Sequence, residues 1–438
     1  MSSPAYTRQP APSRPRIIVI GGGFGGLWAV RALERADVDV ILIDRRNHHL
    51  FQPLLYQVAT AALAAPDIAA PLRQILRRQK NVTVLNDEVR SIDVVSRTIE
   101  TRSERLQYDF LVIASGASHS YFGHDDWAGD APGLKTLEHA LDLRRRILAA
   151  FERAELESDP VSRTDWLRFA IVGGGPTGVE LAGSVVEIAR HTLRGEFRRI
   201  RPETAEVHLI EAGPRLLAGM REASSESARR QLEAMGVRVH TGTPVTAIDS
   251  AGVDFGGHRL ACRTVIWAAG VQASPLGATL GQERDRQGRL PVSSDLTLPG
   301  HPEVFVIGDL ARVAHEGGRV KRGQSPAGTV PLTVPGVAAA AKQMGRYVGV
   351  AIRARLAGRA LSAFRYRDYG TLATIGRKAA VVDIGPFRMS GRLAWWFWLT
   401  AHLFFLIGFR NRLAVILNWA LSYYSRQRYA RIIVSDES

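Results

Sequence analysis

The sequence has very little cysteine: Cys262 is the only one among 438 residues. The chain can therefore form no internal disulfide, no CxxC pair and no cysteine-rich metal cluster. Disulfide reductases and sulfide-oxidising enzymes that work through two reactive cysteines are excluded for the same reason. No apolar run of the signal-peptide type follows the first residues, so we expect the folded part to lie in a reducing compartment.

Acidic residues are scarce relative to basic ones. The chain has 42 Asp and Glu against 57 Lys and Arg, a formal net charge of +15. Such a charge suits nucleic acid, anionic lipid or anionic cofactors, and the chain contains no nucleic-acid-binding motif. Residues 1–15 contain no acid and four prolines. Because proline opposes an amphipathic helix, we expect a disordered leader there.

The rest of the sequence is organised around a strand, turn, helix and strand pattern that begins at residue 16. Its spacing is that of a dinucleotide fingerprint, and it predicts a cofactor site at Gly21, Gly23, Gly26, Asp44 and Arg45. The first glycine allows the tight turn, the second lets the backbone approach a pyrophosphate, and the third lets the helix pack closely on the strand. The acid at the end of the second strand would bind ribose hydroxyls.

The same series begins again at residue 168, which predicts a second nucleotide site. Its cofactor-binding residues are expected to be Gly173, Gly175, Gly178 and Glu211. Glu211 lies well beyond the usual interval of about 20 residues from the glycines, so we expect a longer crossover helix or an insertion near 191–203. Its carboxylate would favour NADH and repel the 2′-phosphate of NADPH, although Arg215 lies close enough in sequence to weaken that argument.

Two further segments complete this pattern. Residues 304–309 form an apolar run that ends in Gly308-Asp309, and we expect this strand to return to the first sheet and make the first domain discontinuous. Residues 138–157 have helical periodicity with many Arg and Leu residues. We expect them to form a solvated helix that covers the first sheet.

Together, the two fingerprints and the returning Gly-Asp strand resemble the flavoproteins with two dinucleotide-binding domains. That resemblance implies FAD at the first site and NAD(P)H at the second. It also implies that Asp309 binds the ribityl chain of the flavin; capping of the following helix is the alternative role.

Other segments narrow the resemblance to one family. Residues 51–60, the second glycine turn with Glu180, residues 334–349 and residues 394–419 resemble the type II, single-subunit NADH:quinone oxidoreductases. The resemblance implies hydride transfer from NADH to FAD, followed by two-electron reduction of a membrane quinone without proton pumping. The quinone is menaquinone or ubiquinone. No metal is required.

The resemblance also implies roles for three polar residues. Gln57 and Gln343 would line the quinone end of the flavin, and Glu180 would help proton delivery. The family often has a second glutamine where this chain has Ala339, so the quinone is less well defined than the flavin. Core packing for Tyr56 and a helix-dipole role for Glu180 are the alternatives.

The tail is the most apolar part of the chain. Residues 393–409 are apolar all round a helix, broken only by Thr400 and His402. At about 1.5 Å per residue they extend roughly 26 Å, which is marginal for a bilayer core of about 30 Å. Trp, Tyr and Arg at the edges are typical of an interfacial anchor. We expect peripheral or monotopic docking through 393–424; a dimer interface or core helix is the alternative.

These observations predict an α/β fold with two Rossmann-like domains and a C-terminal membrane-docking helical module. The expected limits are 16–165 with 290–350 for the FAD domain, 166–289 for the NADH domain and 351–438 for the module. We expect docking on the cytoplasmic face of the bacterial plasma membrane, lipid as a partner and a possible homodimer. A reductase for a soluble acceptor and a nucleotide-binding sensor without turnover are the alternative functions.

Overall fold

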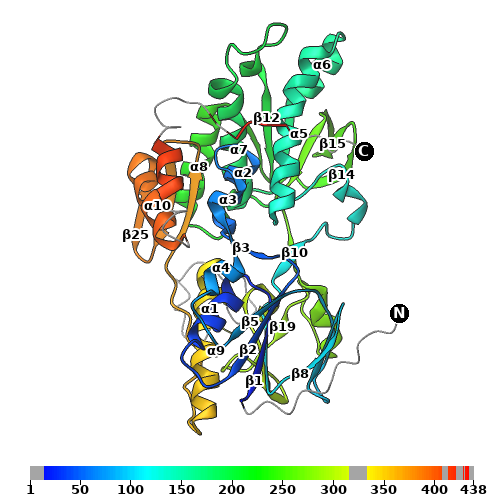
Figure 1. The fold of residues 1–438 in the computed structure, drawn as a ribbon. Helices are drawn as coiled ribbons and strands as arrows, with labels where there is room; N and C mark the ends of the chain where they lie inside the picture. Colours follow the sequence, from blue (N-terminus) through cyan, green and yellow to red (C-terminus); the bar gives the residue numbers. More distant parts are fainter. Residues whose placement is uncertain (1–13, 315–332, 407–412, 421–427, 429, 434–438) are drawn as a thin grey trace, which may run out of the picture. The chain divides into compact units, whose positions relative to one another are not determined.

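The computed structural model describes residues 14–314, 333–406, 413–420, 428 and 430–433. Most of the predicted disordered leader lies outside these residues. The chain divides into two compact units (Figure 1). The first comprises Met1–His49, Pro71–Ser118 and Gln272–Asp368, and the second comprises Leu50–Ala70, His119–Val271 and Tyr369–Ser438. These units divide the chain at other residues than the predicted domain limits.

The first unit is built on a six-stranded sheet in the order β20-β21-β9-β1-β2-β5. Its strands are β1 (Arg16–Ile20), β2 (Asp39–Asp44), β5 (Val82–Asn86), β9 (Phe110–Ile113), β20 (Thr297–Leu298) and β21 (His301–Val306). The strands from β21 to β5 run parallel, and their central apolar residues are buried as such a sheet requires. Val304 of β21 pairs with Leu111 of β9, which confirms that the strand predicted at residues 304–309 returns to the first sheet.

Two helices pack on each other in this unit, α1 (Phe24–Ala32) and α9 (Ala338–Leu356) (Figure 1). A Cβ atom on Gly345 would lie 2.0 Å from the carbonyl oxygen of Gly25, so only glycine permits this approach. The unit also contains α4 (Leu72–Leu76), β19 (Leu290–Pro291), β22 (Ala311–Arg312) and an antiparallel sheet of β6 (Val89–Asp93), β7 (Thr98–Thr101) and β8 (Arg105–Gln107).

The second unit repeats this plan with a four-stranded parallel sheet in the order β13-β12-β11-β17. The strands are β11 (Arg168–Val172), β12 (Glu206–Ile210), β13 (Val237–His240) and β17 (Thr264–Trp267). An antiparallel sheet again follows, formed by β14 (Val245–Asp249), β15 (Gly252–Phe255) and β16 (His258–Ala261). The strand β11 pairs with β12 and β17 as β1 pairs with β2 and β9, which confirms the duplication.

Four of the described helices contact this second sheet; they are α5 (Leu137–Leu156), α6 (Pro160–Trp166), α7 (Pro176–Glu187) and α8 (Glu222–Met235). The unit also contains α2 (Leu55–Ala59), which packs on α5 and α7, and α3 (Ala65–Ile68). The predicted amphipathic helix is α5, but it contacts β17 and α2 of the second unit. Its Phe151 ring lies 5.4 Å from that of Phe169 in β11. The expectation that this helix covers the first sheet is therefore wrong, because periodicity reveals a buried face and not the sheet that buries it.

The long interval before Glu211 has a structural cause. Helix α7 continues into a π-helical turn, Ile188–Thr192, and an irregular segment then leads to a short 3₁₀ turn, Pro202–Thr204. This confirms the predicted insertion near 191–203.

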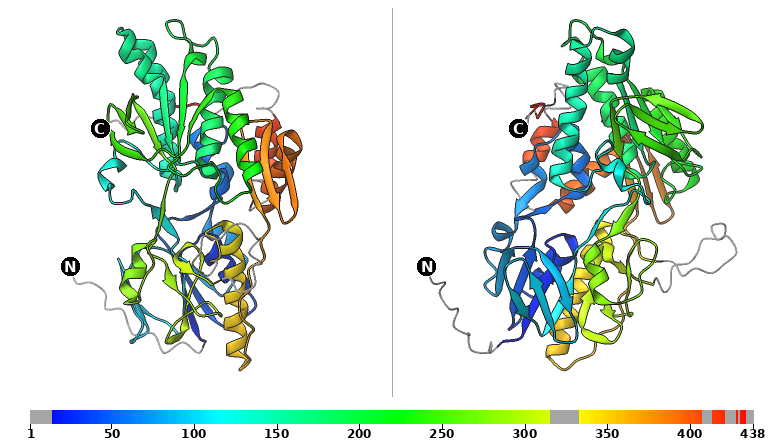
Figure 2. Two further views of the ribbon diagram at one scale, coloured as in Figure 1. Left: turned by 180° about the vertical axis from the view of Figure 1, so that it is seen from behind. Right: turned by 90° about the vertical axis from the view of Figure 1, so that its right-hand side faces the viewer.

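The C-terminal part contains a sheet that the sequence analysis did not predict. Strands β23 (Thr371–Ile375), β24 (Ala379–Ile384) and β25 (Phe387–Ser390) are antiparallel, and α10 (Gly391–Phe405) packs beside them (Figures 1 and 2). Residues 413–420 are also helical. Within the described part of the chain, no helix has the length and apolar character needed to cross a bilayer. Much of the predicted docking segment after residue 406 lies outside that part.

Candidate functional site

The first glycine turn has the geometry that a nucleotide requires. Gly21 has φ +101°, and a Cβ atom there would lie 2.3 Å from the carbonyl oxygen of Ala114. A Cβ atom on Gly26 would lie 1.9 Å from the carbonyl oxygen of Gly21. At Gly23, which precedes α1, a Cβ atom would meet no atom within 4 Å. The turn is thus closed toward the protein and open in front of the helix N-terminus, where phosphate groups bind.

The carboxylate of Asp44 ties this turn to the end of β2. It accepts hydrogen bonds from the backbone N–H of Gly22, at 2.5 Å, and from that of Arg46, at 2.7 Å. Arg45 pairs with Glu88 at 3.3 Å on the protein surface. Gly21, Asp44, Arg45 and Glu88 line one cavity of about 460 Å³ in the first unit, so three of the predicted cofactor-binding residues lie together.

The second turn reproduces the first almost atom for atom. Gly173 has φ +113°, a Cβ atom on Gly178 would lie 1.8 Å from its carbonyl oxygen, and Gly175 again faces open space. Glu211 takes the place of Asp44. Its carboxylate accepts hydrogen bonds from the N–H groups of Gly174, at 2.5 Å, and Gly213, at 2.6 Å.

Two predicted residues of the first unit lie near the start of α9. Gly308 has φ +70°, and its N–H group donates to the sulfur of Met344 at 3.2 Å. Asp309 follows in a short 3₁₀ turn, Gly308–Leu310, and its Oδ1 would lie 3.3 Å from a Cβ atom on Gly336. Gly336 therefore approaches Asp309 closely, and the Asp309 carboxylate lies next to the segment that precedes α9.

Gln343 is held by the backbone of its own unit. Its Nε2 donates to the carbonyl oxygen of Arg367 at 2.9 Å, and its Oε1 accepts from the N–H group of Arg367 at 2.9 Å. Both ends of the amide thus hold the segment that leads toward β23. Gln57 and Glu180, in contrast, belong to the second unit.

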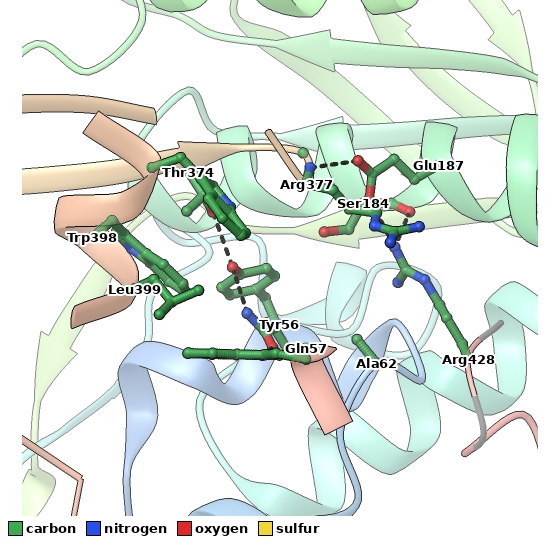
Figure 3. A pocket seen from close by; sticks show the side chains of 13 residues that line it. Tyr56, Gln57, Ala62, Ser184, Glu187, Thr374, Arg377, Trp398, Leu399 and Arg428 are labelled. Carbon is green, nitrogen blue, oxygen red and sulfur yellow. Dashed lines mark hydrogen bonds and ion pairs between the residues drawn. The ribbon is translucent and has the colours of Figure 1, made fainter. Parts of the chain in front are cut away.

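A cavity in the second unit gathers Gln57 with residues far away in sequence (Figure 3). The hydroxyl of Tyr56 lies 2.9 Å from that of Thr374 and accepts a hydrogen bond from Gln57 Nε2 at 3.0 Å. Trp419 Nε1 donates to Gln57 Oε1 at 2.7 Å. The indole of Trp398 is buried, and among the described residues its Nε1 has no hydrogen-bond partner.

Glu180 lies behind this cavity, on α7. Its carboxyl group is buried and accepts a hydrogen bond from the Thr374 N–H group at 3.4 Å. Burial raises the pKa of Glu180 to about 8, because the charged form loses its hydration, and the contacts with Thr374 oppose this only in part. This shift favours the protonated acid at neutral pH.

A buried ion pair closes the other side of the cavity. Arg428 lies 3.2 Å from the Glu187 carboxylate and donates to the carbonyl oxygens of Thr60, at 2.5 Å, and Ser184, at 3.3 Å. Arg428 thereby joins the end of α2, which carries Tyr56, to α7. Burial raises the pKa of Glu187 and lowers that of Arg428, and the attraction between the two opposes both shifts.

Sequence analysis missed several of these residues. Glu187 follows Glu180 by seven positions on an apolar helix, and this spacing puts both acids on one helical face. The spacing therefore indicates Glu187 as a second candidate site residue. No local pattern indicates Thr374, Trp398 or Arg428.

Comparison with known proteins decides the family. Residues 15–345 match the family model described as pyridine nucleotide-disulphide oxidoreductase, and residues 369–426 match that of the NDH2 C-terminal domain. The type II NADH:quinone oxidoreductase NdhA of Mycobacterium tuberculosis is 45% identical over 97% of this chain and 90% of its own length. Its relative Ndh, from the same organism, is 43% identical over 98% and 92%.

The chain belongs to the type II NADH:quinone oxidoreductases. A solved structure of NDH2 from Plasmodium falciparum in complex with NADH has the same fold, with a TM-score of 0.85 at 20% identity over 96% of this chain and 100% of that one. This type II oxidoreductase is a flavin-dependent enzyme that transfers electrons from NADH to a quinone without pumping protons. These comparisons do not support the soluble-acceptor reductase or the sensor without turnover.

The ion pair generates a testable prediction. Arg428→Met leaves the Glu187 carboxylate buried without its cation, so we expect the free energy of unfolding to fall by about 3–5 kcal/mol. Denaturant titration measures this loss. The double variant Glu187→Gln/Arg428→Met should lose less than Arg428→Met alone. Arg145→Met, which breaks a half-exposed pair with Asp142, is the control and should change stability by about 1 kcal/mol or less. Equal losses in Arg428→Met and Arg145→Met would contradict the assigned role.

Proposed function

We propose that the flavin of this enzyme is FAD and that it binds at the first glycine turn. The open space in front of Gly23 fits the pyrophosphate, and the adjoining cavity beside Asp44 and Arg45 fits an adenosine. FMN has no adenosine, so it would leave this cavity unused. When bound, the flavin supplies the redox chemistry by accepting hydride from nicotinamide and passing electrons to quinone.

Asp309 and Gly308 are proposed to hold the ribityl end of the same cofactor. Helix α9 begins close to Asp309, and the positive end of its helix dipole favours the negative charge of the Asp309 carboxylate. In this proposal the first unit binds the flavin and the second unit binds NADH.

The identity of the flavin is the direct test. We expect denaturation of the purified protein to release about one FAD per chain, separated from FMN by chromatography and quantified by absorbance. Release of FMN, or failure of a colourless preparation to take up FAD, would contradict the proposal.

The second site is proposed to prefer NADH to NADPH. Glu211 presents its carboxylate where the ribose hydroxyls would lie, and a 2′-phosphate there would be repelled. Arg215 forms no ion pair with Glu211 among the described residues; its two terminal nitrogens donate instead to the carbonyl oxygens of Ala218 and Met220, each at 2.8 Å.

A substitution at Glu211 tests this preference. Glu211→Gln keeps the side-chain length but removes the negative charge, so the ratio of kcat/KM for NADH to that for NADPH should fall by about tenfold, equivalent to about 1.4 kcal/mol. Glu206→Gln on the same strand is the control and should leave the ratio unchanged. An unchanged ratio in Glu211→Gln would show that the charge does not select the nucleotide.

The quinone is proposed to enter the cavity that Tyr56, Gln57 and Trp398 line. The observation that carries this assignment is the buried Trp398 Nε1–H, a donor with no partner among the described residues and therefore one that a quinone carbonyl would satisfy. Glu180 is proposed to supply the proton that quinone reduction consumes.

Three statements stay predictions from the sequence. The first is that Gln343 lines the quinone end of the flavin. The others are the possible homodimer and the use of menaquinone or ubiquinone.

The C-terminal part is proposed to dock on the membrane surface, on the cytoplasmic side where NADH is available. Exposed apolar side chains gather on α10 and on residues 413–420; they are Leu393, Trp396, Phe397, Phe404, Leu413, Ile416 and Leu417. Spacings of three and four residues place the members on α10 along one helical face. The exposed Arg388 and Arg392 lie close by in sequence and would meet anionic headgroups.

Vesicle binding tests this surface. Replacement of Leu393, Trp396 and Phe404 by Ser removes apolar area worth roughly 1.5–3 kcal/mol per fully buried side chain, so partitioning to anionic lipid vesicles should weaken by about 100-fold or more. Co-sedimentation measures the partition. The same replacement at Val95, Leu156 and Val161, which are exposed elsewhere, should have little effect. Equal binding by both triple variants would rule out α10 as the docking helix.

A further inference from the structure

The acid proposed to deliver the proton does not itself line the quinone cavity. Glu180 lies behind it, whereas the hydroxyl-bearing residues Tyr56 and Thr374 form part of its wall. A proton that leaves Glu180 must therefore cross at least one other side chain to reach a ligand in the cavity.

Short contacts bridge that gap. The Thr374 N–H group donates to the Glu180 carboxyl at 3.4 Å, which places Thr374 beside the acid, and the Thr374 hydroxyl lies 2.9 Å from the Tyr56 hydroxyl. Tyr56 also accepts from Gln57 Nε2 at 3.0 Å, and Trp419 Nε1 fixes the other end of that amide. When Thr374 also donates to Tyr56, the Tyr56 oxygen accepts two hydrogen bonds, and its own hydrogen is left for a group in the cavity.

We propose that the hydroxyls of Thr374 and Tyr56 relay a proton from Glu180 to an oxygen of the bound quinone. This inference rests on the proposed location of the quinone. Both hydroxyls donate and accept, so a proton entering at Thr374 can leave from Tyr56 without creating a charged hydroxyl.

The step is balanced with the reaction of the enzyme. NADH and one proton convert the quinone to quinol and NAD⁺. The nicotinamide supplies two electrons and one hydrogen as hydride, by way of the flavin, and the relay supplies the second proton. The O–H bonds of Glu180, Thr374 and Tyr56 break as those of Thr374, Tyr56 and the quinol form. Glu180 is left as a carboxylate, which takes a proton from water before the next turnover.

The surroundings of the relay favour this direction. Burial raises the pKa of Tyr56, and the negative charges of Glu180 and Glu187 raise it further, so Tyr56 acts as a hydroxyl and not as a tyrosinate. The other charged groups nearby are Arg377, whose N–H donates to Glu187, and Arg428, which pairs with Glu187. Glu187 is thus already neutralised by its partners, and Glu180 is the acid left to supply a proton.

The test separates electron transfer from proton transfer in the flavin-loaded enzyme. Stopped-flow absorbance follows flavin reduction by NADH and then reoxidation by a water-soluble quinone analogue or by ferricyanide, which takes electrons without protons. We expect Thr374→Val and Tyr56→Phe to slow reoxidation by quinone by about 100-fold. This is the lower end of the rate enhancement that a positioned general acid usually provides. Reoxidation by ferricyanide should stay within about twofold of wild type, as should reduction by NADH. Thr374→Ser, which keeps the hydroxyl, should restore the quinone reaction.

The pH profile gives a readout that a structural role would not move. In the wild type, reoxidation by quinone should slow as pH rises through about 8, because Glu180 then loses its proton. Thr374→Val should lose this dependence. Tyr121→Phe is the matched control, because it removes a buried hydroxyl bonded to the Ala131 carbonyl oxygen outside the cavity.

Reoxidation of Thr374→Val or Tyr56→Phe by quinone at the wild-type rate would overturn the relay, as would an equal loss with ferricyanide. If ferricyanide but not quinone reoxidises the wild-type flavin, the proposed function itself fails.

Discussion

One interaction, repeated in each unit, organises this protein: a carboxylate at the end of the second strand binds backbone N–H groups of the glycine turn. Asp44 does this in the first unit and Glu211 in the second. The contact fixes the strand end against the turn, while the close approach of the third glycine fixes the helix. The space left in front of the helix suits the pyrophosphate of a dinucleotide. In the proposed assignment, duplication of the contact supplies both nucleotide sites of a flavin-dependent NADH oxidoreductase.

The proposed quinone cavity follows a different physical rule. Its wall combines indole rings with polar side chains, and burial favours the protonated forms of Glu180 and Tyr56. The raised pKa of Glu180 makes it an acid, and the raised pKa of Tyr56 preserves its hydroxyl. The Glu187–Arg428 pair supplies no proton in this account. It joins the helix that carries Tyr56 to the helix that carries Glu180.

The sequence predicted features that depend on local spacing. Both glycine turns, the strand that returns with Asp309 and the insertion before Glu211 depend on such spacing, and the structure confirms them. Contacts across long separations left no local pattern: Thr374 lies 318 positions from Tyr56, and Arg428 lies 241 positions from Glu187. The β23–β25 sheet was missed because it belongs to neither copy of the repeated pattern from which most of the other strands were predicted. Helix α5 was recognised but assigned to the wrong sheet, since an amphipathic pattern does not identify its partner.

The visible spectrum of a Gly175→Leu variant distinguishes the two proposed nucleotide sites. A Cβ atom there meets no atom within 4 Å, and the leucine side chain would fill the space assigned to the pyrophosphate of NADH. This variant should purify with its flavin bands, NADH at a concentration sufficient to bleach the wild type should leave them unchanged, and dithionite should bleach them. The equivalent Gly23→Leu variant should purify without flavin. Bleaching of Gly175→Leu by NADH as in the wild type, or loss of its flavin, would contradict the assignment of the two sites.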